Sequence, residues 1–210
     1  MANGKSWKRI GLSSSILLAL LLAGTIIVYW KSSTTVVLVV RHAERNDTAT
    51  GCTASAACPL PTSGSPANPP LSVPPAGQIA RADELSRVVE DTGIQAIYAS
   101  CFCRTQQTVE PTANNLGLTT NFVSQHAADG SGDVTNLVSQ ITSNNTGQKI
   151  LVAGHTSTVP MIIEQLGGGT IDPITDSEFD NLYVVTISRG WWLGYGKRVR
   201  VVRLKYGVAT

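Results

Sequence analysis

The uninterrupted apolar run from Val36 to Val40 constrains the fold of this chain more than any other stretch. It is rich in β-branched residues and holds no polar residue, which is typical of a strand buried on both faces in a parallel sheet. Arg41, His42 and Glu44 follow it almost at once. Ligands of open α/β sheets bind just beyond the carboxyl ends of the strands. The run therefore predicts a central strand that carries polar side chains to the edge where sites form.

Strand and helix patterns alternate along the rest of the chain. The predicted strands after the first cover 94–100, 118–124, 148–155, 181–188 and 198–206, and the predicted helices cover 76–93, 101–117, 134–141 and 159–166. Residues 190–196 predict a hairpin between the last two strands. This alternation predicts an α/β fold, a three-layer sandwich whose mostly parallel central sheet is flanked by helices.

The N-terminal segment predicts a membrane anchor. Residues 10–30 carry no charge, and 21 residues at 1.5 Å each reach about 30 Å, the thickness of a bilayer core. The run ends in bulky residues, including Tyr29 and Trp30, which disfavours a cleavable signal peptide, and it is too long for a typical core helix. We expect residues 1–31 to be a retained transmembrane helix and its preceding tail, and residues 32–210 to form one domain.

The charges around this segment predict its orientation. Three cations precede it and only Lys31 follows it, so its N-terminus should face the cytoplasm. The domain would then be periplasmic or extracellular, and secreted if the segment is cleaved. The net charge of +2, without a basic stripe, gives no indication of a nucleic-acid partner, and the oligomeric state is open.

Four cysteines agree with an oxidising compartment. They form two close pairs, Cys52 with Cys58 and Cys101 with Cys103, and lack the spacing of a zinc site. A bond between Cys101 and Cys103 would be strained, so we favour disulfide bonds that join the first pair to the second. Residues 46–75, rich in Pro, Ser, Thr and Ala, predict a long irregular loop over the site.

Two arginines and two histidines fall at the ends of predicted strands. Arg41 and His42 follow the first strand, Arg104 follows the second, and His155 follows the fourth. Paired guanidinium groups bind tetrahedral phosphate oxygens, and a neutral imidazole is a nucleophile toward phosphorus. No carboxylate cluster with metal-binding spacing accompanies them, so the arginines would replace a metal and no cofactor is expected.

These motifs resemble those of the histidine phosphatase superfamily, also called phosphoglycerate mutase-like. The resemblance rests on Arg41-His42-Ala43-Glu44, on the stretch from Ser100 through Arg104 to Thr108, and on the stretch from Gly154 to Pro160. It covers the chain from about residue 35 to 207. The family pattern has glycine where this chain has Ala43, a position that tolerates a small side chain.

The resemblance implies the role of each residue. His42 would form a phosphohistidine that water hydrolyses, while Arg41, Arg104 and His155 bind the phosphoryl group. Glu44 and Thr156 are further candidates for the substrate site, and Glu44 would either orient the site or pair with Arg45. Asp129 is the first candidate for the proton donor, His126 the second and Asp133 the third, the last with an alternative role as a helix cap.

The predicted function is a metal-independent phosphatase that hydrolyses phosphomonoesters. The resemblance extends to a periplasmic branch that acts on phosphorylated envelope sugars, which makes a phosphorylated small molecule or an envelope glycan the expected substrate. The alternatives are a catalytically inactive module that binds a phosphorylated ligand, and a phosphoglycerate mutase-type enzyme. The longer insertion that carries a glutamate in mutases has no counterpart here.

Overall fold

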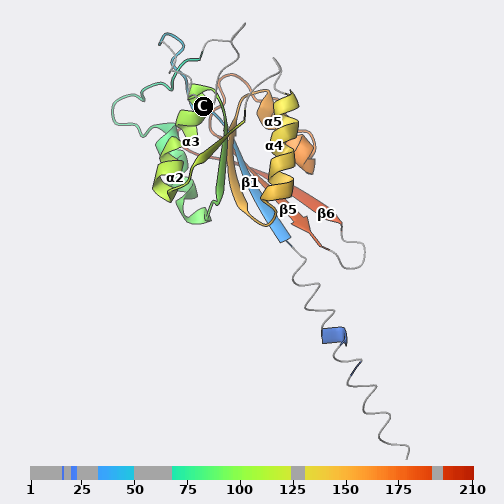
Figure 1. Ribbon diagram of the computed structural model, residues 1–210. Helices are drawn as coiled ribbons and strands as arrows, with labels where there is room; N and C mark the ends of the chain where they lie inside the picture. The colour runs from blue at the N-terminus through green and yellow to red at the C-terminus, as the bar shows by residue number, and fades with distance from the viewer. Residues whose placement is uncertain (1–15, 17–19, 23–32, 50–67, 124–130, 191–195) are drawn as a thin grey trace, which may run out of the picture. The chain divides into compact units, whose positions relative to one another are not determined.

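The computed structural model describes residues 33–49, 68–123, 131–190 and 196–210, together with 16 and 20–22. The chain divides into two compact units, one of Met1–Ser33 with Ser188–Arg198 and one of Thr34–Ile187 with Val199–Thr210. The second unit contains the helices that flank the sheet and most of each strand (Figure 1). Within the described residues, no helix has the length and apolar character needed to cross a membrane. Most of the predicted span over 10–30 lies outside those residues.

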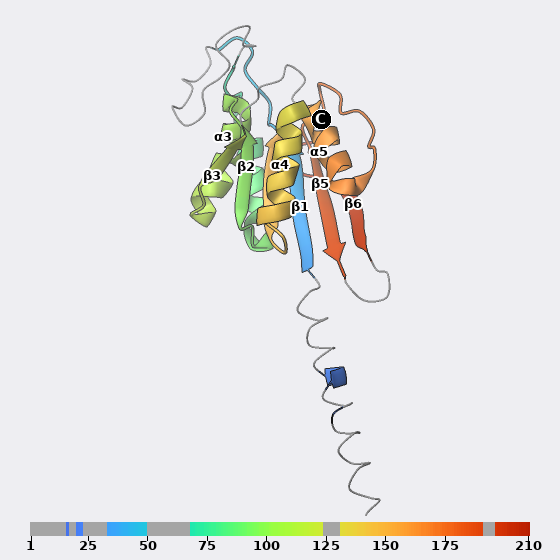
Figure 2. The ribbon, with the colours of Figure 1, turned by 45° about the vertical axis from the view of Figure 1, so that its right-hand side comes forward.

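Six strands form one mixed sheet in the order β3-β2-β4-β1-β5-β6. Their bounds are β1 (Ser33–Arg41), β2 (Ala96–Ser100), β3 (Thr120–Val123), β4 (Lys149–Gly154), β5 (Asn181–Arg189) and β6 (Lys197–Lys205). The pairs β1–β4, β2–β4 and β2–β3 are parallel. Figure 2 shows β5 running in the opposite direction to β1. The predicted α/β class and all six predicted strands are confirmed, with a mixed sheet.

Helices cover both faces of this sheet (Figure 1). On one face lie α2 (Arg81–Val89), extended by a 3₁₀ turn over Glu90–Thr92, and α3 (Cys103–Leu116). On the other lie α4 (Ser131–Asn144) and α5 (Thr158–Ile163), which continues as a π-helical turn over Glu164–Gly168.

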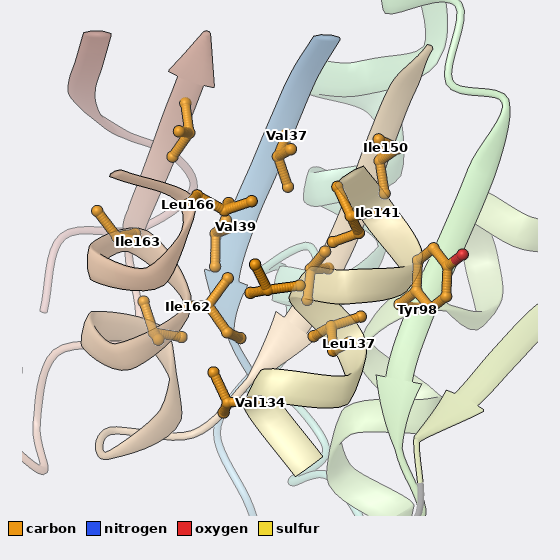
Figure 3. Packing of buried hydrophobic residues seen from close by; sticks show 14 of the residues in the cluster. Val37, Val39, Tyr98, Val134, Leu137, Ile141, Ile150, Ile162, Ile163 and Leu166 are labelled. Atoms are coloured by element: carbon orange, nitrogen blue, oxygen red, sulfur yellow. The ribbon is translucent and has the colours of Figure 1, made fainter. Parts of the chain in front are cut away.

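Alternate residues of β1 belong to two different hydrophobic cores. Val37 and Val39 pack with α4 and α5, as Figure 3 shows, whereas Leu38 and Val40 pack with α2 and α3. All four are buried, as the apolar run predicts for a strand with helices on both sides. The two cores hold β1 in the middle of the molecule.

Two helix starts differ from the sequence-based prediction. The helix predicted from residue 76 begins at Arg81, because Ile79 is 63% exposed and contributes nothing to the buried stripe. The helix predicted after an Asp133 cap begins at Ser131, so Asp133 lies within its first turn. An acidic residue there is favoured by the positive end of the helix dipole, which explains its position without capping.

Truncation of Leu85 tests the α2 side of the core. Leu85 is fully buried on α2, while Val88 on the same helix is 38% exposed. We expect Leu85→Ala to lower the free energy of unfolding by about 2–5 kcal/mol, because it leaves a cavity in a close-packed interior. Urea unfolding measures the loss. Val88→Ala is the matched control and should cost less than about 1 kcal/mol; equal losses would contradict the packing described.

Candidate active site

Strand register brings the ends of three strands to one level. Arg41 pairs with Gly154, and Ala99 pairs with Ala153, so the next residues of β1, β2 and β4 lie at one edge of the sheet. The backbone N–H of His42 donates to the carbonyl of Gly154 at 2.9 Å. As a result the two histidine rings lie near each other, with centroids 5.4 Å apart.

The His42 ring is held in one tautomer by its own backbone. Its Nδ1 lies 2.7 Å from the carbonyl oxygen of Ala43, which can only accept, so the proton of the neutral ring is on Nδ1. The N–H of Ala43 in turn donates to Thr108 Oγ1 at 2.8 Å. Burial and the nearby arginines lower the pKa of His42 to about 3. At neutral pH, His42 therefore carries an unprotonated Nε2.

His155 follows β4 and is almost fully buried. Its backbone N–H donates to Thr158 Oγ1, and its Nε2 lies 2.9 Å from Ser100 Oγ. Burial and the positive charge of Arg104 hold its pKa well below the usual value. The preceding Gly154 is required by close approach, since a Cβ there would lie 2.8 Å from Thr158 Oγ1.

Arg104 lies in the first turn of α3 and is buried with unused donors. Its guanidinium stacks on the ring of Phe102, 4.3 Å from the centroid. Its Nε and Nη1 atoms have no partner among the described residues. Burial and the neighbouring charge of Arg45 lower its pKa to about 10, so the group stays cationic at neutral pH.

Arg41 forms hydrogen bonds with a loop over residues 175–178 that the sequence analysis did not predict as part of the site. Its Nη1 donates to the carbonyls of Thr175, Asp176 and Glu178 at 2.8–3.1 Å, and the guanidinium lies 4.0 Å from the ring centroid of Phe179. Its Nε is buried and unpartnered in the described part of the chain. Its Nη2 lies 3.9 Å from the exposed carboxylate of Asp176. The loop thus orients Arg41 and leaves its Nε without a partner among the described residues.

Together these groups form a buried cationic pocket beside a neutral imidazole. Buried N–H groups without partners are rare, because each costs about 1–3 kcal/mol. Here three nitrogen atoms without partners in the described part of the chain belong to Arg41 and Arg104. A tetrahedral oxyanion would accept from these donors and neutralise both guanidinium groups. The arrangement can bind such an anion next to the nucleophilic Nε2 of His42.

Glu44 does not pair with Arg45, so that alternative is wrong. Both carboxylate oxygens of Glu44 accept from Arg81 at 2.7–3.0 Å, while Arg45 pairs with Asp47. Arg81 also donates to the carbonyls of Tyr206 and Val208. Glu44 therefore links the segment after His42 to α2 and, through Arg81, to the C-terminal end of the chain.

The proton-donor candidates are only partly described. Asp129 and His126 lie outside the described residues, so their roles stay predictions. Asp133 lines a small cavity together with Ser100 and His155. Among the three donor candidates, Asp133 is the one that the described residues include. Thr156 follows His155 directly and is half-buried. Its predicted role in substrate binding stays a prediction.

The predicted 46–75 loop is described at its two ends. Asn68 bonds to the backbone N–H of Cys103, and the N–H of Leu71 donates to Gln107 at 2.8 Å, so this end packs on the start of α3. Neither Cys101 nor Cys103 is a free thiol. Cys52 and Cys58 lie outside the described residues, and the predicted connectivity stays a prediction.

Three residues at the site were not among the predicted site residues. Phe179, whose ring lies 6.0 Å from that of His42, belongs to an irregular segment far along the chain. Phe102 and Ser100 fall within the motif before Arg104, but their contacts with His155 depend on the strand register. For Phe102 and Ser100, their position within that motif was the sequence signal that could have found them.

Comparisons with solved structures find the same architecture. A candidate alpha-ribazole-5'-P phosphatase from Escherichia coli K-12 is 15% identical, with 83% of this chain and 98% of that chain covered and a TM-score of 0.52. The chain therefore shares the fold of this structure.

Two further structures match at slightly lower scores. The protein histidine phosphatase SixA complexed with tungstate is 15% identical over 81% of this chain and 96% of that chain, with a TM-score of 0.49. A phosphoserine phosphatase from Entamoeba histolytica is 14% identical over 83% and 98%, with a TM-score of 0.48. No protein-family model and no curated protein matches the sequence.

Binding of inorganic phosphate tests the cationic pocket. We expect Arg104→Ala to weaken phosphate binding about 100-fold, because two hydrogen bonds to a charged group are lost. Isothermal titration calorimetry gives both dissociation constants. Arg87→Ala is the control, since Arg87 forms an exposed pair with Glu84 on α2. Equal affinity of Arg104→Ala and the unmodified protein would place the anion site elsewhere.

Proposed function

We propose that this protein is a metal-independent phosphatase that hydrolyses phosphomonoesters through a phosphohistidine on His42. One observation carries the proposal: the Ala43 carbonyl holds the His42 proton on Nδ1, which leaves Nε2 unprotonated in a pocket with unpartnered arginine donors. The proposal is also supported by the position of these groups at the carboxyl ends of parallel strands, where α/β sheets commonly bind ligands.

In the first step the phosphoryl group binds to Arg41 and Arg104, and His42 Nε2 attacks phosphorus. The bond from phosphorus to the ester oxygen breaks, and that oxygen leaves with a proton from an acidic side chain. Asp133, Asp129 and His126 remain the candidates for this donor. The two guanidinium groups stabilise the charge on the phosphoryl oxygens, which is the role a metal ion has in other phosphoryl-transfer enzymes.

In the second step water attacks the phosphohistidine. The bond from phosphorus to Nε2 breaks, the residue that gave its proton takes one from the water, and inorganic phosphate is released. His42 Nδ1 keeps its proton throughout, because the Ala43 carbonyl accepts from it in each state. The ring returns to its starting tautomer and is ready for another turnover.

The location and substrate class are proposals that rest on the sequence. The uncharged run over 10–30 with three preceding cations supports a membrane anchor and a domain outside the cytoplasm. In that setting, phosphorylated envelope sugars are the substrates we propose first. Measurement of kcat/KM for sugar phosphates, phosphoserine and a phosphohistidine peptide would rank these substrate classes.

Replacement of His42 tests the covalent step. His42→Ala should abolish acid-labile labelling by a ³²P-phosphomonoester and lower p-nitrophenyl phosphate hydrolysis by at least about a thousandfold, because the nucleophile is removed. The assays contain EDTA. Arg87→Ala is the control and should retain the label, since Arg87 forms an exposed pair with Glu84 on α2.

Each other outcome has a definite meaning. Labelling of His42→Ala would refute His42 as the nucleophile, and activity lost on addition of EDTA would refute the metal-independent mechanism. Phosphate binding without hydrolysis of any phosphomonoester would favour the inactive binding module. Transfer of the label to a second hydroxyl of a phosphoglycerate, rather than to water, would favour the mutase.

The pH dependence follows from the low pKa of His42. With a pKa of about 3, the ring is neutral and nucleophilic at pH 5 as well as at pH 7. We expect kcat/KM, corrected for ionisation of the substrate, to show no loss from His42 protonation between pH 7 and about pH 4.5. Circular dichroism at each pH controls for unfolding. An acid limb centred near 6.5, the ordinary histidine value, would contradict the buried environment described.

A further inference from the structure

A chain of side-chain hydroxyl groups runs from α3 to His155. Thr105 Oγ1 lies 2.8 Å from the carbonyl oxygen of Phe102 and 3.0 Å from that of Ser100. The same Oγ1 lies 2.7 Å from Ser100 Oγ, which in turn lies 2.9 Å from His155 Nε2. Both threonine and histidine are buried, so within the described structure these groups satisfy one another rather than solvent.

The protons of this chain can be counted from its far end. A carbonyl oxygen only accepts, so the single hydroxyl proton of Thr105 is used in a bond to a backbone carbonyl, the usual arrangement for a threonine within a helix. Thr105 Oγ1 then accepts from the hydroxyl of Ser100. Because Ser100 has donated its proton, its oxygen accepts from His155 Nε2. In this direction each of the three protons, from Thr105, Ser100 and His155, has one acceptor.

The opposite direction is less favourable. If Ser100 donated to His155 Nε2, Thr105 would have to donate to Ser100, and its contacts with the two carbonyls would lose their proton. The ring proton would then lie on Nδ1, because Nε2 would accept from Ser100. It would also be exposed to the field of Arg104 and Arg41, which repels an N–H dipole that points toward it.

The geometry points to Ser100 and Thr105 as positioning residues that fix neutral His155 in the Nε2–H tautomer and keep Nδ1 for the phosphoryl group. The inference deepens the proposed function and rests on it for the identity of the ligand. His42 and His155 then hold opposite tautomers within one site. His42 exposes Nε2 to attack phosphorus, and His155 directs Nδ1 to a phosphoryl oxygen. A monoprotonated phosphate ester supplies the proton of the hydrogen bond between that oxygen and Nδ1.

Nitrogen-15 NMR of the histidine rings tests the tautomer without any turnover. The chain holds three histidines, so His126→Gln and His42→Ala assign the signals. Protonated and unprotonated ring nitrogens give well-separated resonances. We expect His155 to show protonated Nε2 and His42 to show protonated Nδ1 in the full-length protein at neutral pH. A His155 ring protonated on Nδ1 would overturn the inference.

Removal of the Thr105 hydroxyl tests the chain itself. In Thr105→Val, Ser100 loses its acceptor and turns to donate to His155 Nε2, so the ring proton should move to Nδ1. We expect kcat/KM for p-nitrophenyl phosphate to fall about tenfold, the effect of one misplaced hydrogen bond. Thr105→Ser restores the hydroxyl and should restore both the tautomer and the rate.

Thr112→Val is the matched control. Thr112 is a fully buried threonine of the same helix, and its Oγ1 has no partner in the described part of the chain. The substitution should change neither the His155 signals nor the rate. The His42 signals report in every variant whether the site is still folded, and Ser100→Ala replaces Thr105→Val if they change.

The outcomes separate this inference from the proposed function. A Thr105→Val protein that retains the Nε2–H tautomer would overturn the hydroxyl chain even if the enzyme is active. Conversely, a protein that hydrolyses no phosphomonoester would overturn the proposed function, while the tautomer of His155 and its change in Thr105→Val would still be read from the spectra.

Discussion

The parallel pairing of β1 with β4 is the constraint on which the rest of the site depends. Arg41 pairs with Gly154, so His42 and His155 leave adjacent strands at the same height. A slip of one residue would turn every side chain of β1 to the other face and exchange the partners of both cores. Because β1 is apolar on both faces, its core side chains would remain buried after such a slip, whereas Arg41 and His42 would no longer lie level with Gly154.

The strand pairing brings the positive charges of Arg41 and Arg104 to a buried place, where the loss of hydration disfavours a charged group. Burial lowers the pKa of Arg41 and Arg104, and the protein compensates only part of the lost hydration. Backbone carbonyls and the Phe179 ring stabilise Arg41, and the Phe102 ring stabilises Arg104. The remaining N–H groups have no partner in the described structure, so an anionic ligand would gain the hydrogen bonds that the fold itself does not supply.

Much of the fold was predictable because it depends on local pattern. The buried run of β1, the alternation of strands and helices, and the glycines that end helices, such as Gly117 with φ of 64°, are visible in the sequence. The start of α2 was not predictable, because Arg81 is buried by Glu44 and by carbonyls near the C-terminus, which are distant in sequence. The same reason explains the wrong pairing of Glu44 with Arg45.

The sequence by itself determined the residue types of the site, Arg41, His42, Arg104 and His155, and their places after predicted strands. Only the tertiary structure decided which atoms of these residues are available for chemistry. The Ala43 carbonyl selects Nε2 of His42, and Ser100 occupies Nε2 of His155. The Thr175 carbonyl, 134 residues along the chain, accepts from Nη1 of Arg41. The physical reason is that hydrogen bonds direct protons and lone pairs, and their partners come from segments that only the folded sheet brings together.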